Sequence, residues 1–267
     1  MKQTPSKDLP PLQRLKDIVH MLRSPGGCPW DIKQTPQSIT PHIIEEAYEL
    51  VQAIESKDIH AIKDELSDAL LHIVMLTEML SETEDISLDS IAEHCSEKMI
   101  RRHPHVFGDT ADINTSDDVK AQWEEIKLKE SKNKGLLDGI PDQLPALWQA
   151  HKIQKKVAQV GFDWPDTTGA TEKLVEECQE LLQATTDGHI DEEIGDILFT
   201  IANICRKEGK HAETLLQNAN KKFKERFKQC EAIAKQHNKP LNTCTLTELE
   251  AFWHQAKVIL QQKTVND

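Results

Sequence analysis

The chain has 267 residues, a formal net charge of −13 and only 4% aromatic residues. Such an acidic chain repels phosphate backbones, which argues against nucleic-acid binding, and the scarcity of short strands with glycine turns argues against an all-β fold. No apolar run reaches the roughly 20 residues that span a bilayer, so we expect no membrane partner. The N-terminus lacks a signal-peptide core and the six cysteines form no CxxC pair, so we expect a cytoplasmic protein.

Apolar residues recur at three- and four-residue steps along most of the chain, which predicts helices. In chain order, the first half is expected to form helices over about 12–23, 43–54, 62–76, 87–101 and 116–130. The second half is expected to form helices over about 145–158, 170–185, 190–207, 211–236 and 245–262. Short loops between consecutive helices favour antiparallel neighbours and a bundle, so the expected fold is all-α.

Four spaced motifs occur twice, in the same order and at nearly the same separation. They are EExxE at 45–49 and 176–180, ExxD at 65–68 and 193–196, KxxxR at 98–102 and 222–226, and WxxxK at 123–127 and 253–257. Four ordered matches are hard to attribute to chance, so we predict two similar tandem domains, residues 1–134 and 135–267. Gly135, Gly139 and Pro141 suit the connecting loop between them.

The EExxE and ExxD motifs each place two carboxylates at the edge of an apolar helix stripe. A residue advances about 100° around a helix, so Glu46 and Glu49 border the stripe formed by Ile43, Leu50 and Ile54. The same angular position recurs in the three other pairs, which are Glu65 and Asp68, Glu177 and Glu180, and Glu193 and Asp196.

If the two acidic helices of each half pack together, four carboxylates converge, and their mutual repulsion favours a bound divalent cation. Oxygen-only ligands favour magnesium, manganese or calcium over zinc. The sequence thus predicts a Mg²⁺ site, with Mn²⁺ also possible, in each half. A solvated acidic helix face is the alternative, which a single pair would favour but four pairs at one angular position do not.

Basic and aromatic pairs accompany the acids in both halves. Lys98 with Arg102, and Lys222 with Arg226, are i,i+4 pairs on one helix face, as suits a polyphosphate beside a metal ion. Ordinary surface basicity is the alternative. The two Trp–Lys pairs at 123–127 and 253–257 could stack on a base, or could anchor a terminal helix, and the two interpretations have equal weight.

Longer segments around these motifs resemble a known family. In the first half they are PGGCPWD (25–31), TPHIIEEAYELVQAI (40–54), DELSDALLHIV (64–74) and KMIRRHPHVFGD (98–109). In the second they are KVAQVGFDW (156–164), EECQEL (176–181), DEEIGDILF (191–199), NKKFKERF (220–227) and LTELEAFWHQAK (246–257). Over essentially its whole length the chain resembles the MazG family of two-domain nucleoside triphosphate pyrophosphohydrolases. The resemblance implies an all-α homodimer or higher oligomer that hydrolyses NTP to NMP and pyrophosphate, with a role in nucleotide-pool housekeeping.

The resemblance also implies a role for individual residues. The metal ligands would be Glu177, Glu180, Glu193 and Asp196 in the second half, with Glu46, Glu49, Glu65 and Asp68 as counterparts. Phosphate or nucleotide contacts would come from Glu176, His189, Asn203, Lys222, Arg226, Trp253 and Lys257, and from Lys98 and Arg102 in the first half. Relatives often carry a lysine where this chain has His189.

Either Glu176 or Glu177 is our candidate for the base that accepts the proton of the attacking water. We expect the second half to be the main catalytic one, because Asn203 and Asn220 correspond to Met75 and Ser96 in the first half. The chain has no GxxxxGK[ST] loop, so metal and side chains must hold the phosphates.

Two other function classes also use an acidic helical bundle. A non-catalytic nucleotide sensor or partner-binding protein could use the same folded site. A carboxylate-bridged di-iron bundle would need ExxH motifs on two helices. The chain has one ExxH, Glu208–His211, beside Gly209 in an expected turn, which disfavours the di-iron alternative.

Overall fold

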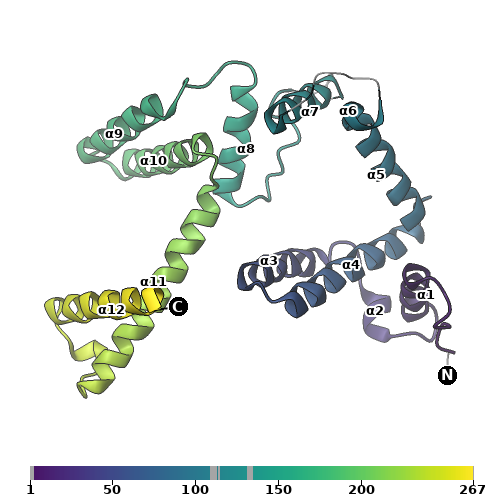
Figure 1. Ribbon diagram of the computed structural model, residues 1–267, viewed down its shortest axis with the longest axis horizontal. Helices are drawn as coiled ribbons and strands as arrows, with labels where there is room; N and C mark the ends of the chain where they lie inside the picture. Colours follow the sequence, from purple (N-terminus) through teal and green to yellow (C-terminus); the bar gives the residue numbers. More distant parts are fainter. Residues whose placement is uncertain (1–2, 109–112, 114, 131–134, 267) are drawn as a thin grey trace. The chain divides into compact units, whose positions relative to one another are not determined.

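The computed structural model describes residues 3–108, 113, 115–130 and 135–266, and these residues form helices and turns without any strand (Figure 1). The helices of the first half are α1 (Pro11–Arg23), α2 (Pro29–Lys33), α3 (Thr40–Ser56), α4 (Ile59–Ser81), α5 (Leu88–Arg102), α6 (Pro104–Phe107) and α7 (Ser116–Glu130). Those of the second half are α8 (Ala146–Ala158), α9 (Thr167–Gln183), α10 (Asp187–Lys207), α11 (Ala212–Gln236), the 3-10 helix η1 (Leu241–Thr243) and α12 (Leu246–Asn266). The all-α prediction is confirmed.

Every helix that the periodicity predicts is present. The short helices α2, α6 and η1 were not expected, because three to five residues are too few to carry a periodic apolar pattern. Among the described residues, no helix combines the length and the apolar composition that crossing a bilayer requires.

The chain divides into two compact units, Met1–Lys132 and Asn133–Asp267, and each is described by itself. The expected boundary after residue 134 adjoins residues 131–134, which lie outside the described residues. In the first unit, α3 and α4 pack against each other, α1 packs on α4, and α2 packs on α1. The main core cluster of this unit comprises Val19, Ile39, Val74, Met75, Met79 and Leu88.

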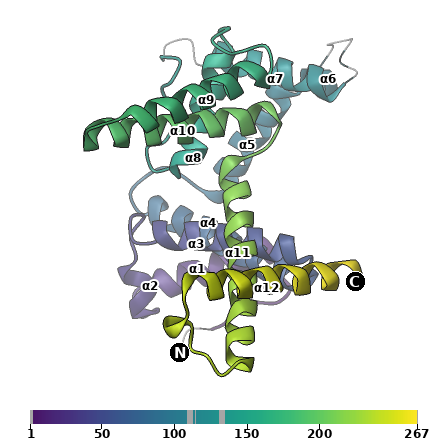
Figure 2. The same cartoon turned by 90° about the vertical axis from the view of Figure 1, so that its left-hand side faces the viewer.

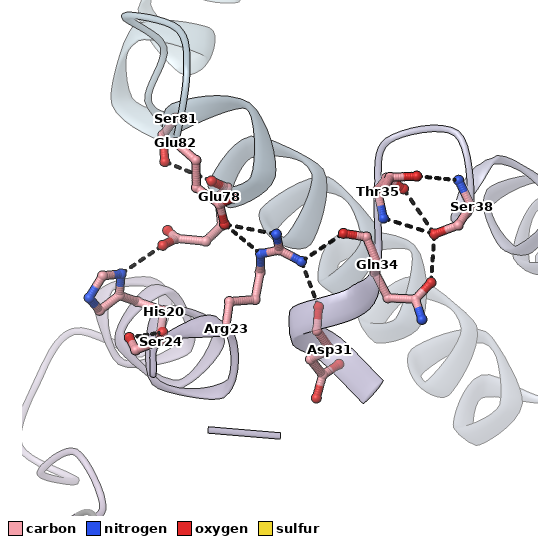
Figure 3. A network of polar contacts seen from close by, with 10 residues as sticks. All are labelled: His20, Arg23, Ser24, Asp31, Gln34, Thr35, Ser38, Glu78, Ser81 and Glu82. Atoms are coloured by element: carbon pink, nitrogen blue, oxygen red, sulfur yellow. Dashed lines mark hydrogen bonds and ion pairs between the residues drawn. The ribbon is translucent and has the colours of Figure 1, made fainter. Parts of the chain in front are cut away.

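The PGGCPWD segment of the first unit forms a corner that Arg23 holds together (Figure 3). The Arg23 guanidinium, whose side chain is only 6% exposed, pairs with Glu82 at 2.8 Å and donates to the carbonyls of Asp31 (2.6 Å) and Gln34 (3.1 Å). Gly27 is required there, because a Cβ would lie 2.2 Å from the Leu22 carbonyl oxygen. The PGGCPWD segment is therefore built as a structural corner.

In the second unit, α9 and α10 form a hairpin, and α8 packs on α10 and α11. Figures 1 and 2 show that α11 leads away from this hairpin and carries α12 at the opposite end of the unit. One core cluster, Ala150, Ala202 and Ala212, joins α8, α10 and α11. Another, with Cys230, Ile233, Ala234, Phe252 and Ala256, joins α11 to α12.

Candidate active site

The α9–α10 hairpin brings carboxylates from its two helices together. Oxygens of Glu177 and Glu180 on α9 and of Glu193 on α10 all lie within 4.8 Å of one another, and these three residues are called the second acid cluster. Asp196 lines the same pocket, of about 440 Å³, one turn after Glu193. The structure thus joins all four predicted acids of this half in one pocket, three of them in close contact.

Side-chain caps fix where the two acidic helices begin. The Asp166 carboxylate accepts from the Thr168 backbone N–H at 2.8 Å, and the Thr186 hydroxyl accepts from the His189 N–H at 3.4 Å. Such caps contribute about 1 kcal/mol each. Because each acid pair has a fixed position on its helix, fixing the helix starts also fixes how the carboxylates face each other.

Lys173 compensates part of the negative charge. Its Nζ lies 2.6 Å from Glu176 and 2.7 Å from Glu177. The Lys173 hydrogen bond lowers the pKa of Glu177, which is only 3% exposed, despite burial. Burial, followed by a hydrogen bond to Glu177, raises the pKa of Glu193. Sequence reasoning missed Lys173, although its i,i+4 spacing to Glu177 could have revealed it.

The two candidates for the catalytic base differ in position. Glu177 lines the acid pocket, whereas Glu176 is exposed on α9 and is not among the residues lining it. His189 does line this pocket, at the start of α10. Of the two candidates, Glu177 is therefore the one that faces the acid pocket.

The first unit repeats the acid arrangement on α3 and α4. Oxygens of Glu46, Glu49 and Glu65, called the first acid cluster, also lie within 4.8 Å of one another. Burial raises the pKa of Glu65, and the charges of Glu49, Glu46 and Asp68 raise it further. The fourth predicted acid, Asp68, is therefore near enough to act on Glu65, although it stands outside the close contact.

The first acid cluster has imidazoles where the second has a lysine. His42 occupies the repeat position of Lys173 and lies 3.6 Å from Glu45. His72 lies 3.6 Å from Glu46, and the two imidazole rings are parallel, with centroids 6.1 Å apart. The two clusters thus have the same set of carboxylates but differ in the basic side chains beside them, a difference that the repeated motifs do not reveal.

The predicted basic and aromatic contacts occupy other helices. Arg226 lies over the Trp253 ring, 5.8 Å from its centroid, and Arg102 lies over Trp123 at 5.3 Å. The same Arg–Trp contact therefore occurs in both units, so the internal sequence repeat is also a structural repeat. Trp253 also contacts Phe223, with ring centroids 4.9 Å apart, so it anchors α12 on α11.

The basic residues are not placed beside the acids within a unit. In the second unit, Lys222, Arg226, Trp253 and Lys257 lie on the α11–α12 pair, whereas the acids lie on α9–α10 (Figure 1). In the first unit, Arg102 lies on α5, one helical turn after Lys98. It forms an ion pair of 2.6 Å with Glu130. Within the second unit, these basic and aromatic side chains are therefore not among the residues that line the α9–α10 pocket.

Two further predicted features lie away from the acids. Asn203 is buried on α10, and its side-chain oxygen accepts hydrogen bonds of 3.0 and 2.7 Å from Arg206. Within the ExxH motif, the His211 ring contacts the rings of Trp148 and His151, with centroids 4.2 and 4.4 Å apart. Neither of the two acid clusters found among the described residues contains a histidine, which disfavours a di-iron centre.

An all-α chain with a carboxylate cluster on each of two repeated helical hairpins has the architecture of a tandem-domain hydrolase. The chain belongs to the MazG nucleotide pyrophosphohydrolase family, whose domain model matches residues 34–107 and 167–231. This membership confirms the resemblance and the enzyme class that the sequence predicts.

Named relatives cover most of the chain. It is 39% identical to the nucleoside triphosphate pyrophosphohydrolase/pyrophosphatase MazG of Thermotoga maritima, over 92% of this chain and 95% of the relative. It is 40% identical to the nucleoside triphosphate pyrophosphohydrolase of Escherichia coli, over 92% and 97% respectively. It is also 40% identical to the YabN protein of Bacillus subtilis, over 91% of this chain and half of that protein.

Proposed function

We propose that this protein hydrolyses nucleoside triphosphates to the monophosphate and pyrophosphate, with Mg²⁺ held by the second acid cluster. The observation that carries the proposal is the convergence of Glu177, Glu180 and Glu193 in one pocket with Asp196. Family membership supports it, as do the printed names of the two relatives that match nearly end to end.

The donor set fits a hard divalent cation. All four ligand candidates offer carboxylate oxygens, which Mg²⁺ and Mn²⁺ prefer. Burial, then a hydrogen bond to Glu177, then the charges of Glu180, Glu177 and Asp196 raise the pKa of Glu193, so a nearby cation would favour its ionised form. A bound Mg²⁺ would supply charge neutralisation for the triphosphate and acidify the attacking water.

The side chains have distinct tasks in this proposal. Glu177, Glu180, Glu193 and Asp196 would hold the cation. Glu177 remains a carboxylate because of Lys173, and it orients the attacking water through a hydrogen bond. His189, at the start of α10, lies where it can contact the phosphates.

We also propose a homodimer. Large apolar side chains are exposed on the acidic hairpins, including Leu182 (86% exposed) on α9, and Phe223 on α11 is 56% exposed. A second copy would cover such surfaces and could bring Lys222, Arg226 and Trp253 to an acid pocket. All six cysteines are free thiols, which suits the cytoplasm as its location.

The test is pyrophosphate release from a panel of NTPs and dNTPs, measured with Mg²⁺, with Mn²⁺ and in excess EDTA. Glu180→Gln should abolish turnover, while Glu172→Gln, an exposed glutamate on the same helix, should leave it intact. Binding of nucleotides without pyrophosphate release under every condition would favour the alternative function, a nucleotide sensor.

A further inference from the structure

The two units make the same arginine–tryptophan contact but differ in what else holds the arginine. Arg102 lies over the Trp123 ring and Arg226 over the Trp253 ring. In the first unit, Glu130 at the end of α7 accepts two hydrogen bonds from Arg102, of 2.6 Å from Nη2 and 3.2 Å from Nε. Among the described residues, Arg226 forms no ion pair.

Glu130 also binds a second arginine. Its Oε1 accepts a hydrogen bond of 2.8 Å from the Nε of Arg101, while its Oε2 accepts both bonds from Arg102. Hydrogen bonds from Arg102 and then Arg101 lower the pKa of Glu130 to about 2, so the carboxylate is ionised throughout the neutral range. Both oxygens are thus bound by guanidinium groups, as phosphate oxygens are when arginines bind a phosphate.

The internal repeat shows that this network belongs to the first unit alone. Glu130 follows the tryptophan of its WxxxK motif by seven residues, and Leu260 follows the other tryptophan by seven. Seven residues advance about 700° around a helix, so each lies on the face of its tryptophan, two turns further on. The KxxxR motifs likewise align Arg101 with Glu225. The second unit therefore has neither the carboxylate nor the second guanidinium at these positions.

An arginine that already binds a carboxylate is less available to a phosphate. Carboxylate and phosphate oxygens compete for the same N–H donors of the guanidinium group. Glu130 belongs to the same chain as Arg102, so it does not diffuse away, and its negative charge also repels a polyphosphate. Arg226 has neither of these obstacles.

We infer that Glu130 is a specificity-determining residue, which closes the basic pair of the first unit to polyphosphate by occupying Arg102 in place of a nucleotide phosphate. This inference rests on the proposed function, in which Arg226 of the second unit contacts the triphosphate. Exchanging the residues at the two repeat positions, Glu130 and Leu260, should therefore exchange the availability of the two arginines.

The first experiment introduces a carboxylate into the second unit of the full-length protein. Leu260→Glu places it on the Trp253 face of α12, where it can pair with Arg226, and should raise the KM for ATP about 10-fold. Leu260→Gln has nearly the same shape without the charge and should have little effect. Val258→Glu, at a position that is 52% exposed, adds the same charge about 140° away around α12 and should leave KM unchanged.

The second experiment removes the carboxylate from the first unit. The probe is α,β-methylene-ATP, whose α–β bridge resists hydrolysis, and its binding with Mg²⁺ is measured by isothermal titration calorimetry. The wild type should bind one nucleotide per chain and Glu130→Leu should bind two. Asp117→Asn, which removes an exposed charge from the same helix, should bind one. Circular dichroism checks the helix content of each variant, and if Glu130→Leu loses helix, the Leu260→Glu result decides alone.

The outcomes separate the role of Glu130 from the proposed function. Absence of wild-type pyrophosphate release from every NTP would overturn the proposed function itself. With an active wild type, an unchanged KM in Leu260→Glu would overturn the role of Glu130 alone. Two nucleotides bound per wild-type chain, or one per folded Glu130→Leu chain, would overturn it as well. A raised KM in Leu260→Glu together with a second bound nucleotide in Glu130→Leu would support it.

Discussion

His151 should make the second unit lose stability on acidification. The ring lies on α8, with its centroid 4.4 Å from that of His211, and its Nδ1 is buried without a partner. Burial, followed by the charges of His211, Arg206 and Lys155, lowers the pKa of His151 from 6.5 to about 4. The folded protein therefore holds this imidazole neutral at pH values where the unfolded chain would protonate it.

The sign and size of the effect follow from proton linkage. The unfolded state takes up the proton first, so the stabilisation is complete above pH 6.5 and is lost as the pH falls toward about 4. Each pKa unit corresponds to about 1.4 kcal/mol, which gives an upper value of about 3 kcal/mol. The ring is only partly buried, so we expect a loss of about 1–2 kcal/mol.

The assay is urea unfolding followed by circular dichroism at several pH values between 7.5 and 4.5. Carboxylates also titrate in this range, so the wild type is compared with His151→Phe, which keeps a planar ring but cannot take a proton. His94→Phe, at an exposed histidine on α5, is the control. If the wild type and His151→Phe lose stability in parallel as the pH falls, the reasoning about this histidine is wrong.

Three further predictions concern activity, assembly and folding. Asp196→Asn should reduce turnover by more than the roughly 10–100-fold typical of residues beyond the metal ligands, with helix content retained by circular dichroism; full turnover in excess EDTA would refute a metal requirement. Light scattering should report at least a dimer, and a fully active monomer would contradict the proposed assembly. Gly27→Ala should destabilise the first unit by about 2 kcal/mol, because its Cβ would meet the Leu22 backbone; an unchanged unfolding midpoint would show that the corner is not rigid.

Much of the fold was predictable because its signals are local. Helix periodicity and i,i+3 acid spacing depend on residues a turn or two apart. The sequence therefore predicts the helices and the position of the carboxylates at the edge of each apolar stripe. The pairing of α9 with α10 was also expected, since only a short turn separates them. The resemblance to the MazG family is confirmed by the domain model.

The surroundings of the acids were harder to predict because they depend on contacts between helices. His42 and His72 come from α3 and α4, and only the packing of these helices brings their rings together. The hydrogen bond from Gln154 to the Phe199 carbonyl similarly joins residues that are 45 apart in the sequence. The roles of Lys222, Arg226 and Trp253 in substrate binding stay predictions, since these residues lie on α11–α12.

The difference between the two acid clusters gives a physical reason to expect unequal activity. Lys173 remains charged because its hydrogen bonds to Glu176 and Glu177 raise its pKa, so the second cluster has a permanent cation. The first cluster has His42 and His72 instead, and it lacks an Asn203 equivalent because Met75 fills the core there.

We therefore expect Glu177→Ala/Glu180→Ala to remove most NTP hydrolysis and Glu46→Ala/Glu49→Ala to remove little. Both variants should remain folded and oligomeric, as judged by circular dichroism and light scattering. Equal loss in the two variants would refute the assignment of the second unit as the main catalytic one. Loss of different substrates would instead mean that both units are enzymes with different specificity, and the imidazole pair beside Glu46 would then be the first place to look for its cause.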